Sequence, residues 1–446
     1  MNEKVSSIIN GTFEIDLIEI ELSKGDTCIT GKGVIYQKNE ELHLKLFNDN
    51  PISEESKIEE FVTSINHSYK TKILQEDDYF TLTGKDENEN LFLSKIHAPY
   101  IASKIIEGKL SANLVKTKIT QKDPLTNIIE IYINDSGPIP LNDSKSIRIF
   151  YRTSEIQSFK PFDDAWFFIV PDKYKIQVQR NDNYQKIRIE TELQVSEEEI
   201  DKILDCLRFV FGRYFNWFYI IFNSDTIEKY NLRKYSVFRN TIFFPPLKIN
   251  NSYNAENYEK LFNYYYAYLS NSDEPAKNLN FYVRKTNIAG YSYLGAFELV
   301  LSISIEGILN SFKTEANSKL VKDENIINDV RKVSKFLEEN FKKENKVRSR
   351  VGGILNIILK NKISGAKDVL NFLIDNKKVG AEYKDVYELR NLFAHAVVPD
   401  NDTTERLSNL HKMIALFYHL VFLQIGYKGQ YTNYFNDELE DFTTTI

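Results

Sequence analysis

Residues 388–396 read ELRNLFAHA, and this stretch decides how the C-terminal part of the chain is interpreted. Apolar residues recur within it at intervals of three and four, the spacing of one face of a helix. Arg390 and His395 lie along the polar flank of that predicted helix. Asn391 and His395 are four residues apart, so the amide can reach the imidazole and orient it.

The helical spacing continues on both sides of this stretch, from Tyr293 almost to the end of the chain. The predicted helices span residues 294–312, 325–343, 350–360, 366–376, 383–397 and 402–425. In the first, the apolar stripe consists of Phe297, Leu301, Ile305, Ile308 and Leu309. The most apolar run, residues 413–425, is too short to cross a bilayer, so we interpret it as a buried helix. Consecutive amphipathic helices joined by short loops predict a helical bundle.

The first 190 residues have a different period. From Thr12 to about Ile189, apolar and polar residues alternate, which is typical of antiparallel strands with one buried face. Residues 39–41, residues 181–183 and the glycine-rich run 25–33 are predicted to be hairpin connections. The last of these departs from the spacing of a phosphate-binding loop.

Two helices are predicted within the rest of the N-terminal region. Ser196 is followed three residues later by Glu199, a capping-box pattern that opens a helix over residues 197–211. A second helix, residues 255–269, is rich in tyrosine, and we expect it to pack onto the sheet.

These patterns predict an α+β protein. A β-rich N-terminal region with packed helices, residues 1–275, precedes an all-α bundle, residues 285–446. The N-terminal region could divide again into residues 1–145 and 146–275. The polar run Asp273-Glu274-Pro275 sets the boundary between the two main regions. A chain of 446 residues also exceeds what one hydrophobic core usually organises.

Composition limits the classes of function. A formal charge of -6 argues against a protein that coats nucleic acid through positive potential alone, although a local basic cleft stays possible. Cys28 and Cys206 are too few for a disulfide framework or a zinc knuckle. No apolar signal segment follows Met1. We therefore expect a cytoplasmic protein that uses no membrane and no metal.

The segment Arg390–His395 resembles the R-x4-H motif of the HEPN superfamily, in the form with Asn directly after the Arg. Ser304–Leu309 resembles the first HEPN helix, in which Glu often occupies the position of Glu306. Arg348–Val351 resembles the Arg-bearing helix midway through many members. With a β-rich region in front, the whole chain is similar to the ApeA family of bacterial anti-phage proteins.

The resemblance implies an endoribonuclease that uses neither metal nor cofactor and acts by abortive infection. It implies cleavage of host or phage RNA, tRNA included, by a homodimer paired through the HEPN domain, and a phage-derived trigger at the N-terminal region. The implied catalytic residues are Arg390 and His395, supported by Asn391 and Glu306. The implied RNA contacts are Lys346, Arg348 and Arg350.

Other interpretations stay open for each of these residues. Lone Arg and His residues on a helix are more often surface or capping residues than catalysts. The basic run 342–350 could be a solvated helix end. Glu306 could pair with Arg390 or Arg350 for purely structural reasons. The whole domain could be a non-catalytic platform for dimerisation or ligand binding, or the toxin of a toxin–antitoxin pair.

Overall fold

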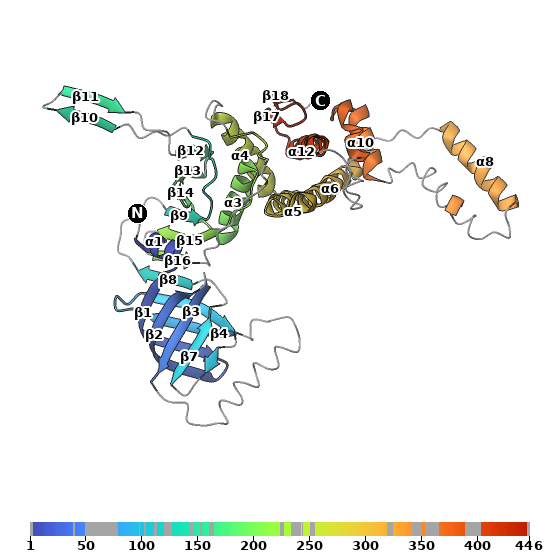
Figure 1. The fold of residues 1–446 in the computed structure, drawn as a ribbon. Helices are drawn as coiled ribbons and strands as arrows, with labels where there is room; N and C mark the ends of the chain where they lie inside the picture. The colour runs from blue at the N-terminus through green and yellow to red at the C-terminus, as the bar shows by residue number, and fades with distance from the viewer. Residues whose placement is uncertain are drawn as a thin grey trace. The chain divides into compact units, whose positions relative to one another are not determined.

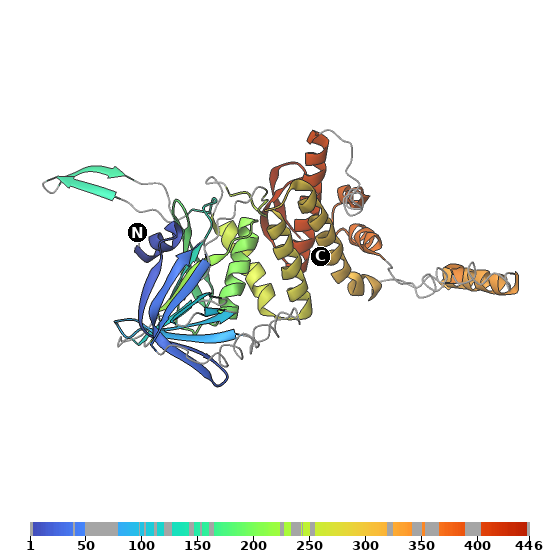
Figure 2. The ribbon, with the colours of Figure 1, turned by 60° about the horizontal axis from the view of Figure 1, so that its bottom comes forward.

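The computed structural model divides into two compact units. We call Met1–Ser196 with Phe215–Arg239 the sheet unit, and Glu197–Tyr214 with Asn240–Ile446 the helical unit. Figures 1 and 2 show both units from two sides. The described residues are 3–38, 41–49, 79–97, 99–101, 104–110, 114–119, 127–141, 147–151, 154–159, 165–223, 227–232, 242, 244–249, 255–318, 324–340, 350–352, 365–388 and 403–443.

The sheet unit contains a sheet of 14 strands in the order β12-β13-β14-β9-β15-β16-β8-β5-β4-β1-β2-β3-β7-β6, and every neighbouring pair is antiparallel. These strands are β1 (Glu14–Lys24), β2 (Thr27–Lys38), β3 (Glu41–Asn48), β4 (Tyr79–Lys85), β5 (Leu91–His97), β6 (Tyr100–Ile101), β7 (Ile105–Lys109), β8 (Leu114–Ile119), β9 (Asn127–Ile133), β12 (Ala165–Val170), β13 (Tyr174–Arg180), β14 (Gln185–Thr191), β15 (Trp217–Asn223) and β16 (Ile227–Leu232). A separate hairpin joins β10 (Ile147–Tyr151) to β11 (Ser154–Phe159), and helix α1 (Glu3–Asn10) precedes β1. The predicted split at residue 145 therefore cuts through one continuous sheet.

The sheet curls around its own core. Strand β5 is not a neighbour of β7 in this order, yet Ile96 of β5 forms a bridge with Leu110, directly after β7, so the strands from β5 to β7 close on one another (Figure 1). In β3, Leu42, Leu44 and Leu46 are buried while their neighbours are not, which confirms the predicted alternation. Burial of each such side chain contributes roughly 1.5–3 kcal/mol.

The predicted hairpins are also present. Lys38 pairs with Glu41 at the end of β2 and β3, and Arg180 pairs with Gln185 at the end of β13 and β14. Between β1 and β2 the chain turns at Gly25, whose φ is 54°. The glycine-rich run 25–33 is thus a turn followed by a strand, and the structure gives it no phosphate-binding loop.

The helical unit contains α3 (Glu197–Phe211), α4 (Ala255–Ser270), α5 (Glu274–Ala289), α6 (Leu294–Ser311), α7 (Lys313–Ser318), α8 (Glu324–Asn340), α10 (Ala366–Asp375) and α12 (Thr403–Ile425), with the 3-10 helix η2 (Ala381–Tyr383). All five residues of the stripe predicted for α6 are buried. The predicted buried helix at 413–425 is the second half of α12, where Met413 and Leu416 are inaccessible to solvent.

The predicted domain boundary falls inside α5. Asp273 is the N-cap of that helix, since its carboxylate accepts a hydrogen bond from the Ala276 amide at 2.8 Å. Pro275 occupies the first turn, where a missing amide hydrogen costs nothing. The polar run, which the sequence predicts to be a domain boundary, is therefore a helix start.

Helix α4 packs on other helices of its own unit, whereas we expected it to cover the sheet. Its Tyr265 ring stacks on Phe209 of α3 with centroids 4.3 Å apart, and its Tyr264 meets Tyr427 beyond α12. Residues 203–211 of α3 are all buried, as in a helix surrounded by protein. Both helices belong to the helical unit.

The helical unit is not entirely α-helical, which corrects the all-α prediction. After α12 the chain forms an antiparallel hairpin of β17 (Gly429–Asn433) and β18 (Glu438–Phe442). Asn257 of α4 donates a hydrogen bond to Gln430 at 2.6 Å, so the hairpin is attached to the helices.

Two helices of this unit end in the same way. At α3, the Gly212 amide donates to Phe209 and the Arg213 amide to Arg208, while Gly212 has a φ of 62°. At α12, Gly426 has a φ of 67° with the corresponding bonds. This is the Schellman pattern. The surroundings differ, because a Cβ on Gly212 would lie 2.3 Å from the Pro245 backbone, whereas one on Gly426 would meet open space.

Among the described helices, α6 is long and apolar enough to span a bilayer by length and composition. It nevertheless carries the buried acid Glu298, which pairs with Arg406 of α12. Thr286 of α5 also donates a hydrogen bond to Ser304 of α6 at 3.0 Å. These contacts are those of a core helix within a folded unit.

Candidate functional site

The motif residues Arg390, Asn391 and His395 lie outside the described residues, as do Lys346 and Arg348. Their predicted roles are therefore neither supported nor contradicted by coordinates. The chain is described up to residue 388 and again from residue 403, and both flanking parts contact other helices.

The chain enters the motif from a packed anchor. Val386 and Tyr387 are buried, and residues 386–388 are already helical. Lys367 of α10 forms an ion pair with Glu388, two residues before Arg390. The sequence predicted a helix from residue 383, and the described helical residues begin at 386, after the 3-10 helix Ala381–Tyr383.

The chain leaves the motif into α12, and an ion pair holds the first turns of that helix. Arg406 Nε donates to Glu298 Oε1 at 2.8 Å, and Nη2 donates to Oε2 at 2.6 Å. Glu298 is 1% exposed. The hydrogen bond to Glu298 raises the pKa of Arg406. This two-pronged geometry is the strong form of a carboxylate–guanidinium pair, so it fixes α12 against α6.

Glu306, the acid that the sequence singled out on α6, is half-buried. Glu306 lies on the same helix face as Leu299 and Ile303, because residues three or four positions apart are neighbours on a helix surface. Its predicted pairing with Arg390 falls outside the described residues, and Arg350 is exposed. The deeply buried acid of α6 is Glu298. Sequence reasoning missed it because its partner is distant in the chain.

A second polar cluster lies between α12 and the C-terminal hairpin. His419 Nε2 is 2.6 Å from the Tyr431 hydroxyl, and that hydroxyl donates to Glu440 at 2.8 Å. Since the single hydroxyl proton goes to Glu440, Nε2 of His419 must carry the proton of the first bond. The Tyr383 ring lies 5.0 Å from that of His419. The cluster thereby anchors η2, seven residues before Arg390.

The two histidines of α12, His411 and His419, lie in packed environments. Burial lowers the pKa of His419 to about 4. Burial also lowers the pKa of His411, whose ring meets Phe244 at 5.5 Å. Across the described part of the chain, no three His, Cys, Asp or Glu side chains are grouped as metal ligands would be.

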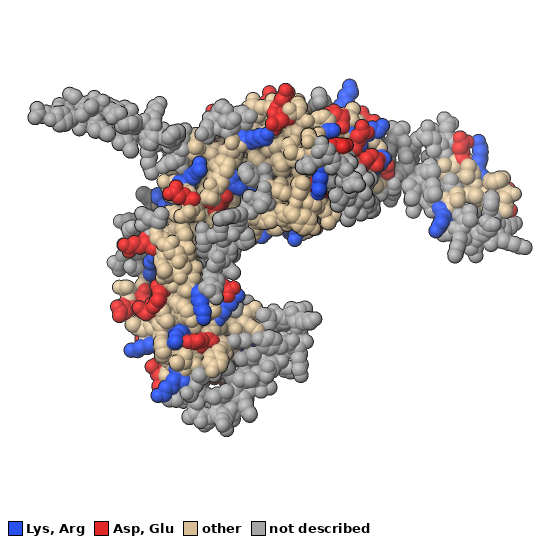
Figure 3. Space-filling model, viewed as in Figure 1, with Lys and Arg blue, Asp and Glu red and all other residues tan. Residues whose placement is uncertain are grey.

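Charge on the described surface is mixed. On the face seen in Figure 3, Lys and Arg side chains alternate with Asp and Glu side chains over both units. Arg350, one of the predicted RNA contacts, is exposed. This face of the described residues therefore offers isolated cations, and a continuous basic track is not seen on it.

No protein-family model matches the chain, and no curated protein or solved structure matches it either. The functional assignment thus depends on the motif, on its chemistry and on the helical unit that carries it.

Proposed function

We propose that this chain is a metal-independent endoribonuclease of the HEPN type, which acts in the bacterial cytoplasm and defends the cell against phage by abortive infection. The observation that carries the proposal is the spacing of Arg390, Asn391 and His395 on one predicted helix. The described ends of that segment support the proposal, because both are fastened to neighbouring helices.

The residue types suit cleavage of RNA by its own 2'-hydroxyl. That hydroxyl loses its proton and attacks the adjacent phosphorus, the bond from phosphorus to the 5'-oxygen breaks, and the departing oxygen takes up a proton. The products are a 2',3'-cyclic phosphate and a free 5'-hydroxyl. His395 exchanges the proton near neutral pH, for a rate gain of about 10^2 to 10^4. Asn391 orients its ring.

Arg390 stabilises the phosphorane, which carries more negative charge than the ground state. A guanidinium matches two phosphate oxygens at once, which an ammonium cannot do. Loss of one such stabilising group typically raises the barrier by roughly 3 to 4 kcal/mol. Glu306 supports the site from α6 in this proposal.

A homodimer completes the site, since one chain supplies a single motif histidine and the reaction needs both a base and an acid. Two-fold pairing of the motif helices brings two Arg390 and two His395 to one groove. The exposed face of α6 is consistent with such pairing. Leu299 is 37% exposed and Ile303 is 50% exposed, at adjacent positions along the helix.

The test compares full-length wild type with His395→Ala and Arg390→Lys. Both variants should fold, and RNA cleavage should fall at least a hundredfold in each. Arg331→Ala, a change at an exposed position of α8, is the matched control and should cleave like the wild type. Cleavage should persist in chelator and leave 2',3'-cyclic phosphate ends. Unchanged cleavage by the His395 variant would end the assignment.

The same experiment separates the alternatives. A folded dimer without cleavage under inducing conditions would favour a non-catalytic platform, for which the exposed apolar face of α6 would be the contact surface. Toxicity neutralised by the product of a neighbouring gene would favour a toxin. Sequencing of RNA from cells that express the wild type and the His395 variant identifies the cleaved RNA.

A further inference from the structure

A hollow of about 400 Å³ lies in the sheet unit, and none of the residues assigned to RNA cleavage lines it. It is bounded by α1, the start of β1, the turn between β4 and β5, and the strands β8, β15 and β16. Its volume falls in the range of sites that hold small organic molecules, roughly 300–1,000 Å³.

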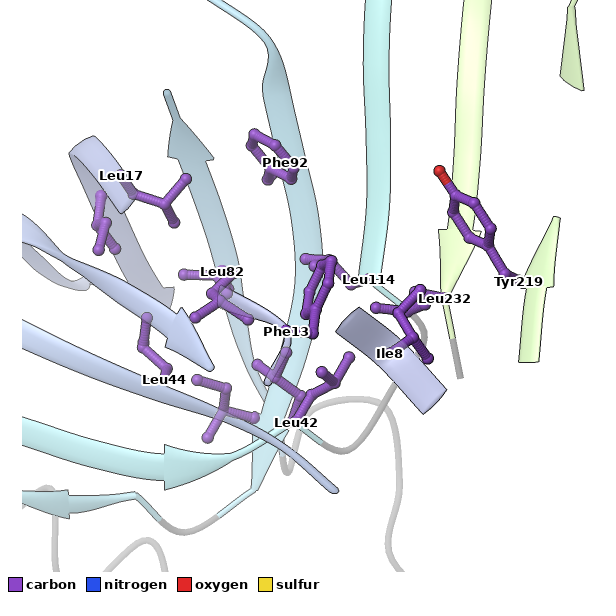
Figure 4. Close-up of a cluster of buried hydrophobic side chains, with 14 of the residues drawn as sticks. Ile8, Phe13, Leu17, Leu42, Leu44, Leu82, Phe92, Leu114, Tyr219 and Leu232 are labelled. Carbon is purple, nitrogen blue, oxygen red and sulfur yellow. The ribbon is translucent and has the colours of Figure 1, made fainter. Parts of the chain in front are cut away.

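The floor of the hollow is apolar and largely aromatic. It is formed by Phe13, Phe92, Leu114, Tyr219 and Leu232, each at most 8% exposed. Figure 4 shows Phe13 next to Leu114 and Leu232, with Phe92 and Tyr219 on either side. These side chains belong to the hydrophobic core of the unit, so the floor is preformed and rigid.

The rim carries three carboxylates for which the described part of the chain offers no partner. The side chains of Glu14, Asp16 and Glu87 make no hydrogen bond and no ion pair within the described part of the chain. Glu14 and Asp16 alternate along β1 and are both exposed. Because side chains alternate along a strand, these two carboxylates share the face opposite to Ile15 and Leu17, and they border the hollow at its outer edge.

A fourth acid, Asp86, shapes the turn. Its Oδ1 accepts hydrogen bonds from the backbone amides of Asn88 and Asn90, both at 2.9 Å. This carboxylate is therefore used in holding the β4–β5 turn, and it presents Glu87 at the rim. The turn is a fixed wall of the hollow.

The two lysines at the hollow are already engaged. Lys116 Nζ lies 5.7 Å from the centroid of the Phe92 ring and interacts electrostatically with Asp86. Lys4 also has an interaction partner. Together these two lysines face four carboxylates in the lining, Glu14, Asp16, Asp86 and Glu87, so the formal charge of the hollow is -2.

We propose that this hollow binds a small organic cation, an amine with a flat apolar body. The body lies on the aromatic floor, and the ammonium group faces the rim carboxylates. Cations are attracted both by carboxylates and by the faces of aromatic rings. A phosphate or carboxylate ligand would instead meet a lining with more negative than positive charge, so anionic ligands such as nucleotides are disfavoured.

Two probes of equal shape and opposite charge test the proposal. Tryptamine and indolepropionate carry the same ring and chain, with an ammonium or a carboxylate at the end. Isothermal titration of the full-length protein should show tryptamine binding at least tenfold more tightly than indolepropionate. The preference should shrink at high salt, because the rim charges are exposed.

Substitutions inside and outside the hollow test whether tryptamine binds there. Glu87→Gln should weaken tryptamine about threefold to fivefold, whereas Glu89→Gln, in the same turn but outside the hollow, should not change it. Ser7→Trp, on α1, should fill the hollow and abolish binding. Equal binding of both probes, no binding of either at millimolar concentration, or full binding by the Ser7 variant would each overturn the proposal.

Discussion

The ion pair between Glu298 and Arg406 offers the sharpest test of how the helical unit is held together. In Arg406→Ala, the guanidinium is lost and the Glu298 carboxylate stays behind, with its side chain 2% exposed. Removal of one partner of a buried pair typically costs about 3–5 kcal/mol. We expect about 3 kcal/mol, the lower end, because the Arg406 side chain is 24% exposed and water can enter where it lay.

The double variant Glu298→Leu/Arg406→Leu separates a buried charge from lost packing. It leaves no charge to bury, so it should lose less stability than Arg406→Ala alone. Lys332→Ala is the matched surface control, since it breaks the exposed pair with Asp329. Its effect should stay within about 0.5 kcal/mol.

The assay is urea unfolding followed by two signals. Far-ultraviolet circular dichroism reports mainly the helices, and tryptophan fluorescence reports the sheet unit, because Trp166 and Trp217 both lie there. The Arg406 variant should shift the dichroism transition more than the fluorescence transition. A loss below about 1 kcal/mol, or a double variant as unstable as the single one, would refute the reasoning.

Three further outcomes are expected. Gly212→Ala should destabilise the helical unit by about 1–3 kcal/mol more than Gly426→Ala. Both substitutions place a side chain at a positive φ, but only the Cβ at position 212 would clash with the Pro245 backbone. Equal losses of stability in urea unfolding would contradict this clash. Burial lowers the pKa of His419 to about 4, below its ordinary 6.5, so as the pH falls the unfolded chain binds the proton before the folded chain does. The free energy of unfolding should therefore fall by up to about 3 kcal/mol as the pH drops from 6.5 to 4. In His419→Phe, the free energy of unfolding should depend less on pH over this range. Ile303→Arg should shift the proposed dimer toward monomer in light scattering without unfolding it, and an unchanged mass would place the contact elsewhere.

Local patterns predicted most of the elements. The predicted burial of alternate residues in β3 and of the apolar stripe of α6 is confirmed, because the polarity of a side chain indicates whether it is buried. The polar run before α5 was misread for the same local reason. Asp, Glu and Pro open a helix as readily as they form a linker, and only the packing of the following residues separates the two.

Partners distant in the chain could not be predicted. Two acids lie on α6, and nothing in the local sequence says that Glu298 is the buried one, because Arg406 lies far along the chain. Tyr431 and Glu440 belong to a short hairpin whose strands are only five residues each, too brief for a clear period. For α3 the sequence did offer a signal that the end of the helix is enclosed by protein. This signal is the unbroken apolar run Phe209-Val210-Phe211, which has no polar face.

The route of the chain has a consequence for its synthesis. Helix α3 emerges from the ribosome between strands of the sheet unit, yet its Phe209 packs against Tyr265 and Tyr418, which are made later. At about 5–20 residues per second, α12 follows roughly ten to forty seconds after α3. For that interval the buried face of α3, which includes Ile203, Leu207 and Phe209, lacks the partners that α4 and α12 supply, so α3 is a segment that a chaperone on the nascent chain would bind.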